Sequence, residues 1–381
     1  MSNKLPYNKP FMTGKELDYI KDAHARGQVA GDGHYTKLCE KYLEGHLGAE
    51  RVLLTHSCTA ALEMTALLLD LEEGDEVIMP SYTFVSTANA FALRGVIPVF
   101  ADVKPETMCI DEQMIPSLIT SRTKAILPVH YAGISCDMES IMAMSQRYNL
   151  DIIEDAAQAL GSKYSGKMLG SIGKLGTLSF HETKNIISGE GGALVINDST
   201  LIEKAQIIRE KGTNRCSFFR GEVDKYTWVD LGSSYLPGEL ISAFLYAQLI
   251  ESININERRS QLWHEYYTLF EILEVRGDIR RPDVPSNCIH NGHIFFLLVN
   301  SAEIRFKLIE YLNNRGIGSI FHYIPLHSSP AGIKYGATRL PLPNTEEYSS
   351  RLVRLPLWHD MDAADVERVF MEVRSFFSNS F

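Results

Sequence analysis

The 381-residue sequence lacks several features that mark specialised classes of protein. Its six cysteines form no C-x-x-C pair, the spacing typical of zinc ribbons and redox sites. No apolar run approaches the roughly 18 residues that a membrane-spanning helix needs. The first residues, MSNKLPYNKPFMTG, contain no apolar stretch of the kind found in signal peptides. These absences predict a cytoplasmic protein with reduced thiols and no association with a membrane.

The sequence also lacks an excess of positive charge and any internal repeat or low-complexity tract. Its 37 basic and 47 acidic residues give a net charge of −10, which argues against a general nucleic-acid binder. A pocket for an anionic small molecule is still compatible with this charge, because a few local basic groups can govern one site. The length exceeds that of a typical single domain and predicts a large domain with a smaller one.

Short apolar runs alternate with helical patterns in the first part of the chain. Alternation of this kind predicts βαβ units, and hence an α/β fold with a largely parallel sheet covered by helices on both faces. The predicted strands are 51–55, 76–80, 97–102, 124–129, 150–155 and 193–196, and the predicted helices are 15–26, 35–47, 59–71 and 83–94.

The pattern changes after about residue 245. We predict one long charged helix over 246–275, a strand over 293–300, and helices over 302–315 and near 363–378. The sequence therefore predicts a large α/β domain over 1–245 and a smaller α+β domain over 246–381.

Polar residues that follow predicted strands are the first candidates for a site, because ligands of open α/β sheets gather at the carboxyl ends of the strands. Ser57, Cys58 and Thr59 begin a predicted helix, whose first amides favour an anion such as a phosphate. Ser57 would equally serve as an ordinary helix cap. Asp155 ends a strand and would stabilise a protonated pyridine nitrogen, or simply cap the following turn.

Lys184 stands out among the lysines. It follows Ser179 in the run SFHETKN and precedes the glycine-rich GEGG. In a partly desolvated site an amine has a lowered pKa and bonds readily to an aldehyde such as that of pyridoxal 5'-phosphate (PLP). Most single lysines are solvated surface charges, and the glycines would also permit a plain tight turn. Its place after an acidic residue that could serve the same ring favours a cofactor role.

A fourth candidate is the segment 321–327, FHYIPLH, in the second half of the chain. His322, Tyr323 and His327 suit polar recognition of a sugar or a phosphate. Packed histidines are an equally good interpretation. No cysteine or carboxylate nearby completes a credible ligand set, so we predict no metal site.

Several of these motifs occur in order along almost the whole chain. They include SCTAALEMTALLLDLEEGDEVIMPSYTFVSTANA, PVHYAG, IIEDAAQALGSKYSGKMLG, LSFHETKNI, GEGGALVIND and FHYIPLH. In this order they resemble the DegT/DnrJ/StrS family of sugar-nucleotide aminotransferases. The resemblance implies the fold-type-I architecture of PLP-dependent transferases. HETKN, FHYIPLH and the run REKGTNRCSFFRGEVDKYTW are most similar to the branch that forms dTDP-4-amino-4,6-dideoxygalactose for bacterial surface polysaccharides, notably enterobacterial common antigen.

The resemblance also implies roles for individual residues. Lys184 would bond the cofactor and move the proton between substrate and cofactor carbons, while Asp155 would hold the pyridine nitrogen protonated. The remaining implied contacts are Gln158 near the ring's phenolic oxygen, Phe84 stacked on the ring face, the amides of Cys58 and Thr59 with the Ser179 hydroxyl on the phosphate, and His322, Tyr323 and His327 on the sugar nucleotide.

The sequence departs from the broad family at two positions. Many members have glycine where Cys58 stands, and many have an asparagine, offered to the partner subunit's cofactor phosphate, near the position of Ser234. The cross-subunit contact is therefore in question, but the resemblance still implies a homodimer with shared active sites.

The implied reaction transfers an amino group from glutamate to a nucleotide-linked keto sugar. The resemblance favours dTDP-4-dehydro-6-deoxy-D-glucose. Three alternatives stay open: an aminotransferase that makes the gluco epimer or a 3-amino sugar, a PLP-dependent sugar dehydratase, and a non-catalytic regulator. The dehydratases resemble a variant with histidine at the lysine position, so Lys184 disfavours that alternative.

Overall fold

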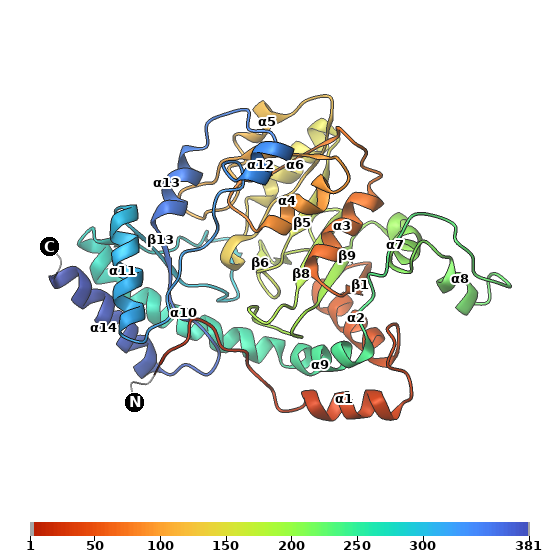
Figure 1. Cartoon of the computed structure of the whole chain (residues 1–381), viewed down its shortest axis with the longest axis horizontal. Coiled ribbons are helices and arrows are strands. Elements are labelled where there is room, and N and C mark those ends of the chain that lie inside the picture. The colour runs from red at the N-terminus through yellow and green to blue at the C-terminus, as the bar shows by residue number, and fades with distance from the viewer. Residues whose placement is uncertain (1–3, 380–381) are drawn as a thin grey trace.

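A seven-stranded sheet lies at the centre of the larger body of the computed structural model, which describes residues 4–379 (Figure 1). Its order is β1-β9-β8-β5-β4-β2-β3, and the strands are β1 (Arg51–Thr55), β2 (Glu76–Pro80), β3 (Ile97–Ala101), β4 (Thr123–Ile126), β5 (Asp151–Asp155), β8 (Leu175–Ser179) and β9 (Gly192–Ile196). Strand β9 runs antiparallel to both neighbours, and all the other neighbouring pairs are parallel. The predicted α/β class is confirmed. The pattern revealed neither β8 nor the reversed direction of β9.

Helices cover both faces of this sheet. The helices of the larger body are α1 (Glu16–Ala25), α2 (His34–Leu47), α3 (Cys58–Leu68), α4 (Val85–Ala92), α5 (Ile115–Leu118), α6 (Met138–Tyr148), α7 (Ile202–Arg209), α8 (Arg215–Phe219) and α9 (Glu239–Ile250), and most of them pack on the sheet. Alternate residues of β1 show the two layers, because successive side chains of a strand point to opposite faces. Val52 and Leu54 pack in the core that contains α2, whereas Leu53 packs with α3 and α7.

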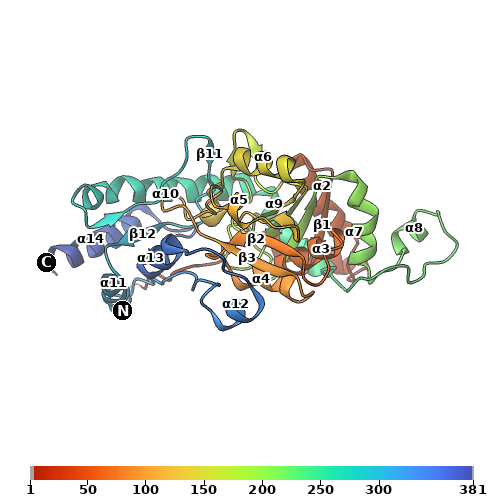
Figure 2. The same ribbon diagram turned by 90° about the horizontal axis from the view of Figure 1, so that it is seen from above.

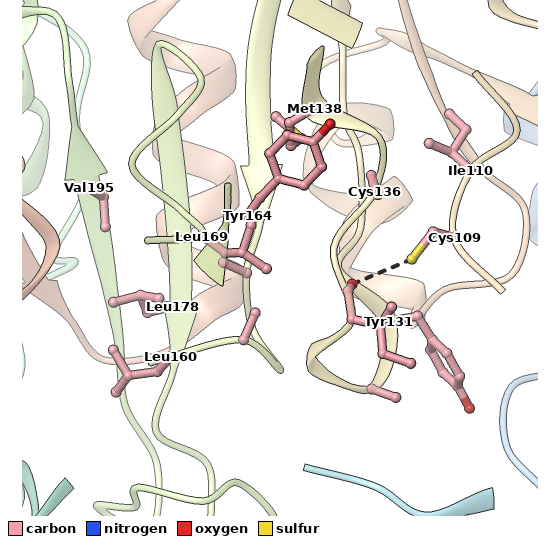
Figure 3. Close-up of a cluster of buried hydrophobic side chains, with 14 of the residues drawn as sticks. Cys109, Ile110, Tyr131, Cys136, Met138, Leu160, Tyr164, Leu169, Leu178 and Val195 are labelled. Carbon is pink, nitrogen blue, oxygen red and sulfur yellow. Dashed lines mark hydrogen bonds between the residues drawn. The ribbon is translucent and has the colours of Figure 1, made fainter. Parts of the chain in front are cut away.

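Part of the larger core lies beside the edge where β6 (Lys163–Tyr164) pairs with β7 (Lys167–Met168) and β11 (Cys288–Ile289) (Figure 3). Tyr164, Cys109 and Cys136 are all buried there, and the Cys109 thiol donates a hydrogen bond to the Ile134 carbonyl at 3.4 Å. Burial raises the pKa of the Cys136 thiol well above its usual value. None of the six cysteines forms a disulfide, so these thiols act as packing groups.

The second body has a three-stranded antiparallel sheet of order β10-β12-β13. Its strands are β10 (Ile279–Arg280), β12 (Phe296–Val299) and β13 (Leu352–Arg354), and its helices are α10 (Ser252–Val275), α11 (Ala302–Asn314), α13 (Pro343–Arg351) and α14 (Ala363–Asn379). The short helix α12 (Pro330–Tyr335) lies instead beside β3 of the larger sheet, where Ala337 forms a bridge with Val99. The prediction of a single helix over 246–275 was wrong. The chain leaves the helical conformation at Glu251, where φ is −100° and ψ is 4°, so α9 and α10 are separate helices.

The beginning of the described chain lies on the second body. Leu5 is buried in the core of that body, its amide donates to the Gly316 carbonyl, and its carbonyl accepts from the Gly318 amide, both at 2.8 Å. The Trp358 indole donates to the Pro6 carbonyl at 3.0 Å. The second body is thus built from both ends of the described chain. The division at residue 245 stays a prediction.

A segment around α8 projects away from the larger body (Figure 2). It carries exposed aromatic and aliphatic side chains, among them Phe219 (66% exposed), Trp228 (74%) and Leu231 (59%). Across residues 4–379, we find no helix with the length and apolarity needed to cross a membrane.

Candidate active site

A pocket of about 640 Å³ lies where the carboxyl ends of β5 and β8 face the second body. The two bodies contribute opposite walls. The first wall comes from the larger sheet and its helix starts, and the second wall comes mainly from the second body. Nine of the residues predicted from the sequence line this pocket: Cys58, Thr59, Phe84, Asp155, Gln158, Ser179, Lys184, His322 and Tyr323.

The start of α3 forms one end of the first wall. Ser57 caps the helix, because its Oγ accepts a hydrogen bond from the Ala60 amide at 3.1 Å. Cys58 and Thr59 are the first two helical residues, so their amides have no partner within the helix. Gly192 allows β9 to approach closely, because an added Cβ would lie 2.4 Å from the Cys58 nitrogen. The capping and anion-binding interpretations therefore coexist, and the free amides suit a phosphate.

The carboxylate of Asp155 is held by two donors at the end of β5. Its Oδ2 accepts from the Thr87 hydroxyl at 2.8 Å, and its Oδ1 accepts from the Ala157 amide at 3.1 Å. The side chain is 5% exposed and lines the pocket. Thr87 was missed in the sequence. A signal was present in PSYTFVSTANA, because Thr83 and Thr87 lie four residues apart and their hydroxyls are 2.9 Å apart.

Lys184 lies in the connection between β8 and β9. Its amide donates to the His181 carbonyl at 2.9 Å, and its side chain lines the pocket. Burial lowers the pKa of this amine below its usual value, although Cys58 and Asp155 act in the opposite direction. A lowered pKa increases the neutral fraction of the amine, and the neutral amine is the form that bonds to a carbonyl group.

A fixed amide connects the first wall to the second. Gln158 Oε1 accepts from the Ala132 amide at 2.7 Å, and Nε2 donates to the Tyr323 hydroxyl at 2.8 Å. The two bonds define which end of the amide faces Tyr323. The rings of Tyr323 and His322 stack with centroids 3.7 Å apart. Burial lowers the pKa of His322 well below its usual value, so this ring is neutral.

The second wall contains three residues that the sequence did not reveal: Tyr7, His293 and Arg354. His293 has a defined tautomer. The Asn185 amide nitrogen donates to Asn256 Oδ1 at 2.9 Å and to the Asn291 carbonyl at 2.8 Å, so the Asn185 oxygen accepts from His293 Nδ1 at 2.9 Å. Burial lowers the pKa of His293 well below its usual value. The bare nitrogen of this neutral ring is Nε2.

Comparison with known proteins identifies the family. The family model described as the DegT/DnrJ/EryC1/StrS aminotransferase family matches residues 10–374. The chain belongs to this aminotransferase family. The sequence is 33% identical, over 383 aligned residues, to the uncharacterized protein MJ1066 of Methanocaldococcus jannaschii, with 99% of this chain and 98% of that protein covered.

Two solved structures resemble the aminotransferase over its whole length. The aminotransferase TlmJ from Streptoalloteichus hindustanus has a TM-score of 0.91 and 27% sequence identity, with all of both chains covered. Helicobacter pylori PseC, an aminotransferase of pseudoaminic acid biosynthesis, has a TM-score of 0.90 and 27% identity, again with all of both chains covered. The expected fold-type-I architecture is confirmed.

Members of this family use PLP, and the pocket of the aminotransferase fits that group. Three parts of PLP need different partners: an amine for the aldehyde, a carboxylate for the ring nitrogen, and donors for the phosphate. Lys184, Asp155 and the free amides at the start of α3 all line the one pocket. The predicted cofactor is confirmed. Each contact of a particular residue with it stays a prediction.

Two predicted residues lie outside the pocket of the single aminotransferase chain. His327 is bound to other protein groups, since its Nδ1 lies 2.7 Å from Ser81 Oγ and its Nε2 lies 3.3 Å from Glu346 Oε1. Ser234 pairs with Glu210 in an isolated β-bridge. Within residues 4–379, no group of three or more His, Cys, Asp or Glu residues could hold a metal ion.

Proposed function

We propose that this aminotransferase moves an amino group from glutamate to C4 of dTDP-4-dehydro-6-deoxy-D-glucose, giving dTDP-4-amino-4,6-dideoxy-D-galactose. The product would serve the synthesis of bacterial surface polysaccharides in the cytoplasm. The observation that carries the proposal is the meeting of Lys184 and Asp155 with His322 and Tyr323 in one pocket. The first pair suits cofactor chemistry, and the second offers polar aromatic groups to a sugar.

The substrate assignment is supported by three motifs. HETKN surrounds Lys184, FHYIPLH supplies His322 and Tyr323, and REKGTNRCSFFRGEVDKYTW forms the projecting segment around α8. These are the motifs that resemble the branch acting on the dTDP-linked 4-keto sugar. The pocket volume of about 640 Å³ is also in the range of small-molecule sites.

The residues would divide the work between the two walls. PLP, when bound, supplies the electron sink. Lys184 would hold the cofactor through its aldehyde and would move the proton to and from the reacting carbon of the substrate. Asp155, oriented by Thr87, keeps a proton on the ring nitrogen. Cys58 and Thr59 amides and the Ser179 hydroxyl hold the phosphate, and Phe84 covers the ring face.

The sugar would lie against the second wall. Gln158, which donates to the Tyr323 hydroxyl, would lie near the phenolic oxygen of the cofactor ring. The neutral His322, stacked on Tyr323, would offer a hydrogen-bonding edge to the sugar. His327 would contribute to sugar binding indirectly, because its side-chain contacts hold the backbone of residues 321–327 in position. In this arrangement the first wall performs the proton transfer and the second determines which face of the sugar receives the proton.

A homodimer is part of the proposal. The exposed Phe219, Trp228 and Leu231 on the projecting segment form an apolar surface of the kind that marks a protein interface. Ser234, near the base of the same segment, would then face the cofactor phosphate of the partner subunit. Sedimentation analysis of the holoenzyme tests this part, and a monomer at micromolar concentration would contradict it.

The function is tested by assaying the PLP-loaded enzyme with glutamate and a panel of nucleotide-linked keto sugars. We expect amination of the dTDP-linked 4-keto sugar, with NMR showing the galacto configuration at C4. A gluco or 3-amino product would show that the protein is a sugar aminotransferase with a different product from the one proposed. PLP binding without any turnover would favour the alternative that the protein is a non-catalytic regulator.

A further inference from the structure

Arg354 is an unusual cation for the inner part of a pocket. It ends β13 and lines the same pocket as Lys184. Within residues 4–379, no carboxylate forms an ion pair with it and its side chain has no hydrogen-bond acceptor; its Nε is buried without a partner. Its guanidinium lies over the face of the Tyr7 ring, 4.6 Å from the ring centroid. A guanidinium has five donors, and leaving them without acceptors in a partly buried site is costly.

The carboxylates of the pocket are unsuited to this guanidinium. Asp155 lies at the other wall, where Thr87 and the Ala157 amide hold it. Glu190, whose side chain is 72% exposed, lies 3.7 Å from His181. The positive charge of Arg354 acts instead on other residues of the pocket. It contributes to lowering the pKa of Lys184, His293 and His322. Arg354 is therefore close to the reacting amine and lacks an anion.

The missing anion can be identified by its distance from the reacting atom. In an amino acid, the α-carboxylate is attached directly to the carbon that exchanges its amino group. In a nucleotide-linked 4-keto sugar, several ring atoms separate the diphosphate from the reacting carbon, so that group must lie farther from Lys184. The cofactor phosphate has a separate set of donors at the start of α3. A guanidinium in the same pocket as Lys184 matches the α-carboxylate best, since a planar fork binds a carboxylate with two parallel hydrogen bonds.

We propose that Arg354 binds the α-carboxylate of the amino-acid donor. The inference rests on the proposed function, because it requires an amino acid as one of the two substrates. The face of the Tyr7 ring packs against the guanidinium and helps to hold it in position. Arg354 offers N–H donors, whereas His293 offers the lone pair of Nε2, which is an acceptor and repels a carboxylate. The donor is thereby directed to the Arg354 side of the pocket.

The test separates the two half-reactions of the PLP-loaded enzyme with Arg354→Gln and, as a matched control, Arg315→Gln. Arg315 ends the helix α11 and pairs with Glu372 at 3.0 Å, away from the pocket. We expect Arg354→Gln to raise the glutamate concentration needed for half-maximal conversion to the pyridoxamine form about 10- to 100-fold, the range for a lost charge-assisted bond. Amination of the keto sugar by the pyridoxamine form should change less than about threefold.

Donor analogues identify which carboxylate is bound. Wild type should prefer glutamate to 4-aminobutyrate, which lacks the α-carboxylate, and Arg354→Gln should lose most of that preference. The preference for glutamate over glutamine, which changes only the distal group, should persist. Binding of unreactive glutarate to the holoenzyme, measured by calorimetry, gives a readout independent of turnover and should weaken in Arg354→Gln alone.

Several outcomes would overturn the inference. These are equal effects of Arg354→Gln and Arg315→Gln, an equal loss in both half-reactions, loss of PLP binding, or a collapse of the glutamate-to-glutamine preference only. Failure of the proposed sugar substrate is distinguishable, because the glutamate half-reaction needs no sugar. If glutamate converts the cofactor normally and no keto sugar accepts the amine, the subsite stands and the substrate assignment fails.

Discussion

The two walls of the pocket are built in different ways. The first wall carries Asp155 at the end of β5, Lys184 in the connection between β8 and β9, and the start of α3 after β1, all attached to one sheet with a buried core. The second wall combines residues 320–323 with His293, Arg354 and Tyr7, which come from distant parts of the chain and from irregular segments or strand ends. A rigid wall suits chemistry common to a family, while a wall made largely of loops can vary with the substrate.

The largest effect is expected from Lys184→Ala, which removes the reacting amine from the first wall. Turnover should be abolished, and the visible absorbance of lysine-bound PLP should disappear, while the circular dichroism spectrum stays unchanged. Lys174→Ala is the control, since Lys174 pairs with Asp151 at the outer end of the same sheet and should leave turnover intact. Retained turnover in Lys184→Ala would refute the assignment of the catalytic lysine.

A smaller effect on the same wall is expected from Asp155→Asn. The amide keeps the shape of the side chain but cannot stabilise a positive ring nitrogen, so kcat should fall about 100-fold or more, as for other losses of preorganised charge. Both half-reactions should slow together, because they use the same ring. The control is Asp151→Asn at the other end of β5. A normal kcat in Asp155→Asn would show that Asp155 is not the partner of the ring nitrogen.

The second wall is tested by Tyr323→Phe. This change leaves the Gln158 amide nitrogen without its acceptor, which costs about 1–3 kcal/mol for a buried donor. We expect KM for the keto sugar to rise about tenfold, with a smaller change in the glutamate half-reaction. Tyr335→Phe, at a residue that is 50% exposed on α12, is the control. Equal slowing of both half-reactions would show that the two walls do not divide the work as proposed.

The smallest effect is expected from His327→Phe. The change removes the side-chain contacts to Ser81 and Glu346 that help to anchor the 321–327 segment, while the backbone amide of residue 327 still donates to Ser81 Oγ. Stability should fall by about 1 kcal/mol, and KM for the sugar should rise less than about threefold. Chemical denaturation and steady-state kinetics measure the two quantities. A tenfold rise in KM at unchanged stability would instead favour direct contact of His327 with the substrate.

The first wall could largely be predicted from the sequence, because its residues lie in continuous motifs at the end of one predicted strand or shortly before another. Asp155 and Lys184 are examples, and the structure places both at the pocket. His293 and Arg354 lie within or beside the apolar runs HIFFLLV and RLVRLPL, where local pattern indicates only a strand. Their role depends on tertiary contacts that bring distant segments together.

Two features of the fold were inaccessible for related reasons. Hydrophobic periodicity identifies a strand but not its direction, so the reversal of β9 could not be predicted. The break between α9 and α10 falls in LIESIN, which contains neither glycine nor proline. Helical propensity continues through Glu251, so the local sequence gives no sign that two helices meet there.

The contacts of Leu5 and Pro6 with the second body have a consequence for synthesis of the chain. Leu5 emerges from the ribosome well before its partners Ile317, Gly316 and Gly318, and Pro6 emerges well before its partner Trp358. The segment around Leu5 must therefore wait, without these partners, until residues 316–318 and Trp358 have been translated. The second wall, with Tyr7 beside Arg354, can form only after this wait, so the pocket acquires its two walls in sequence.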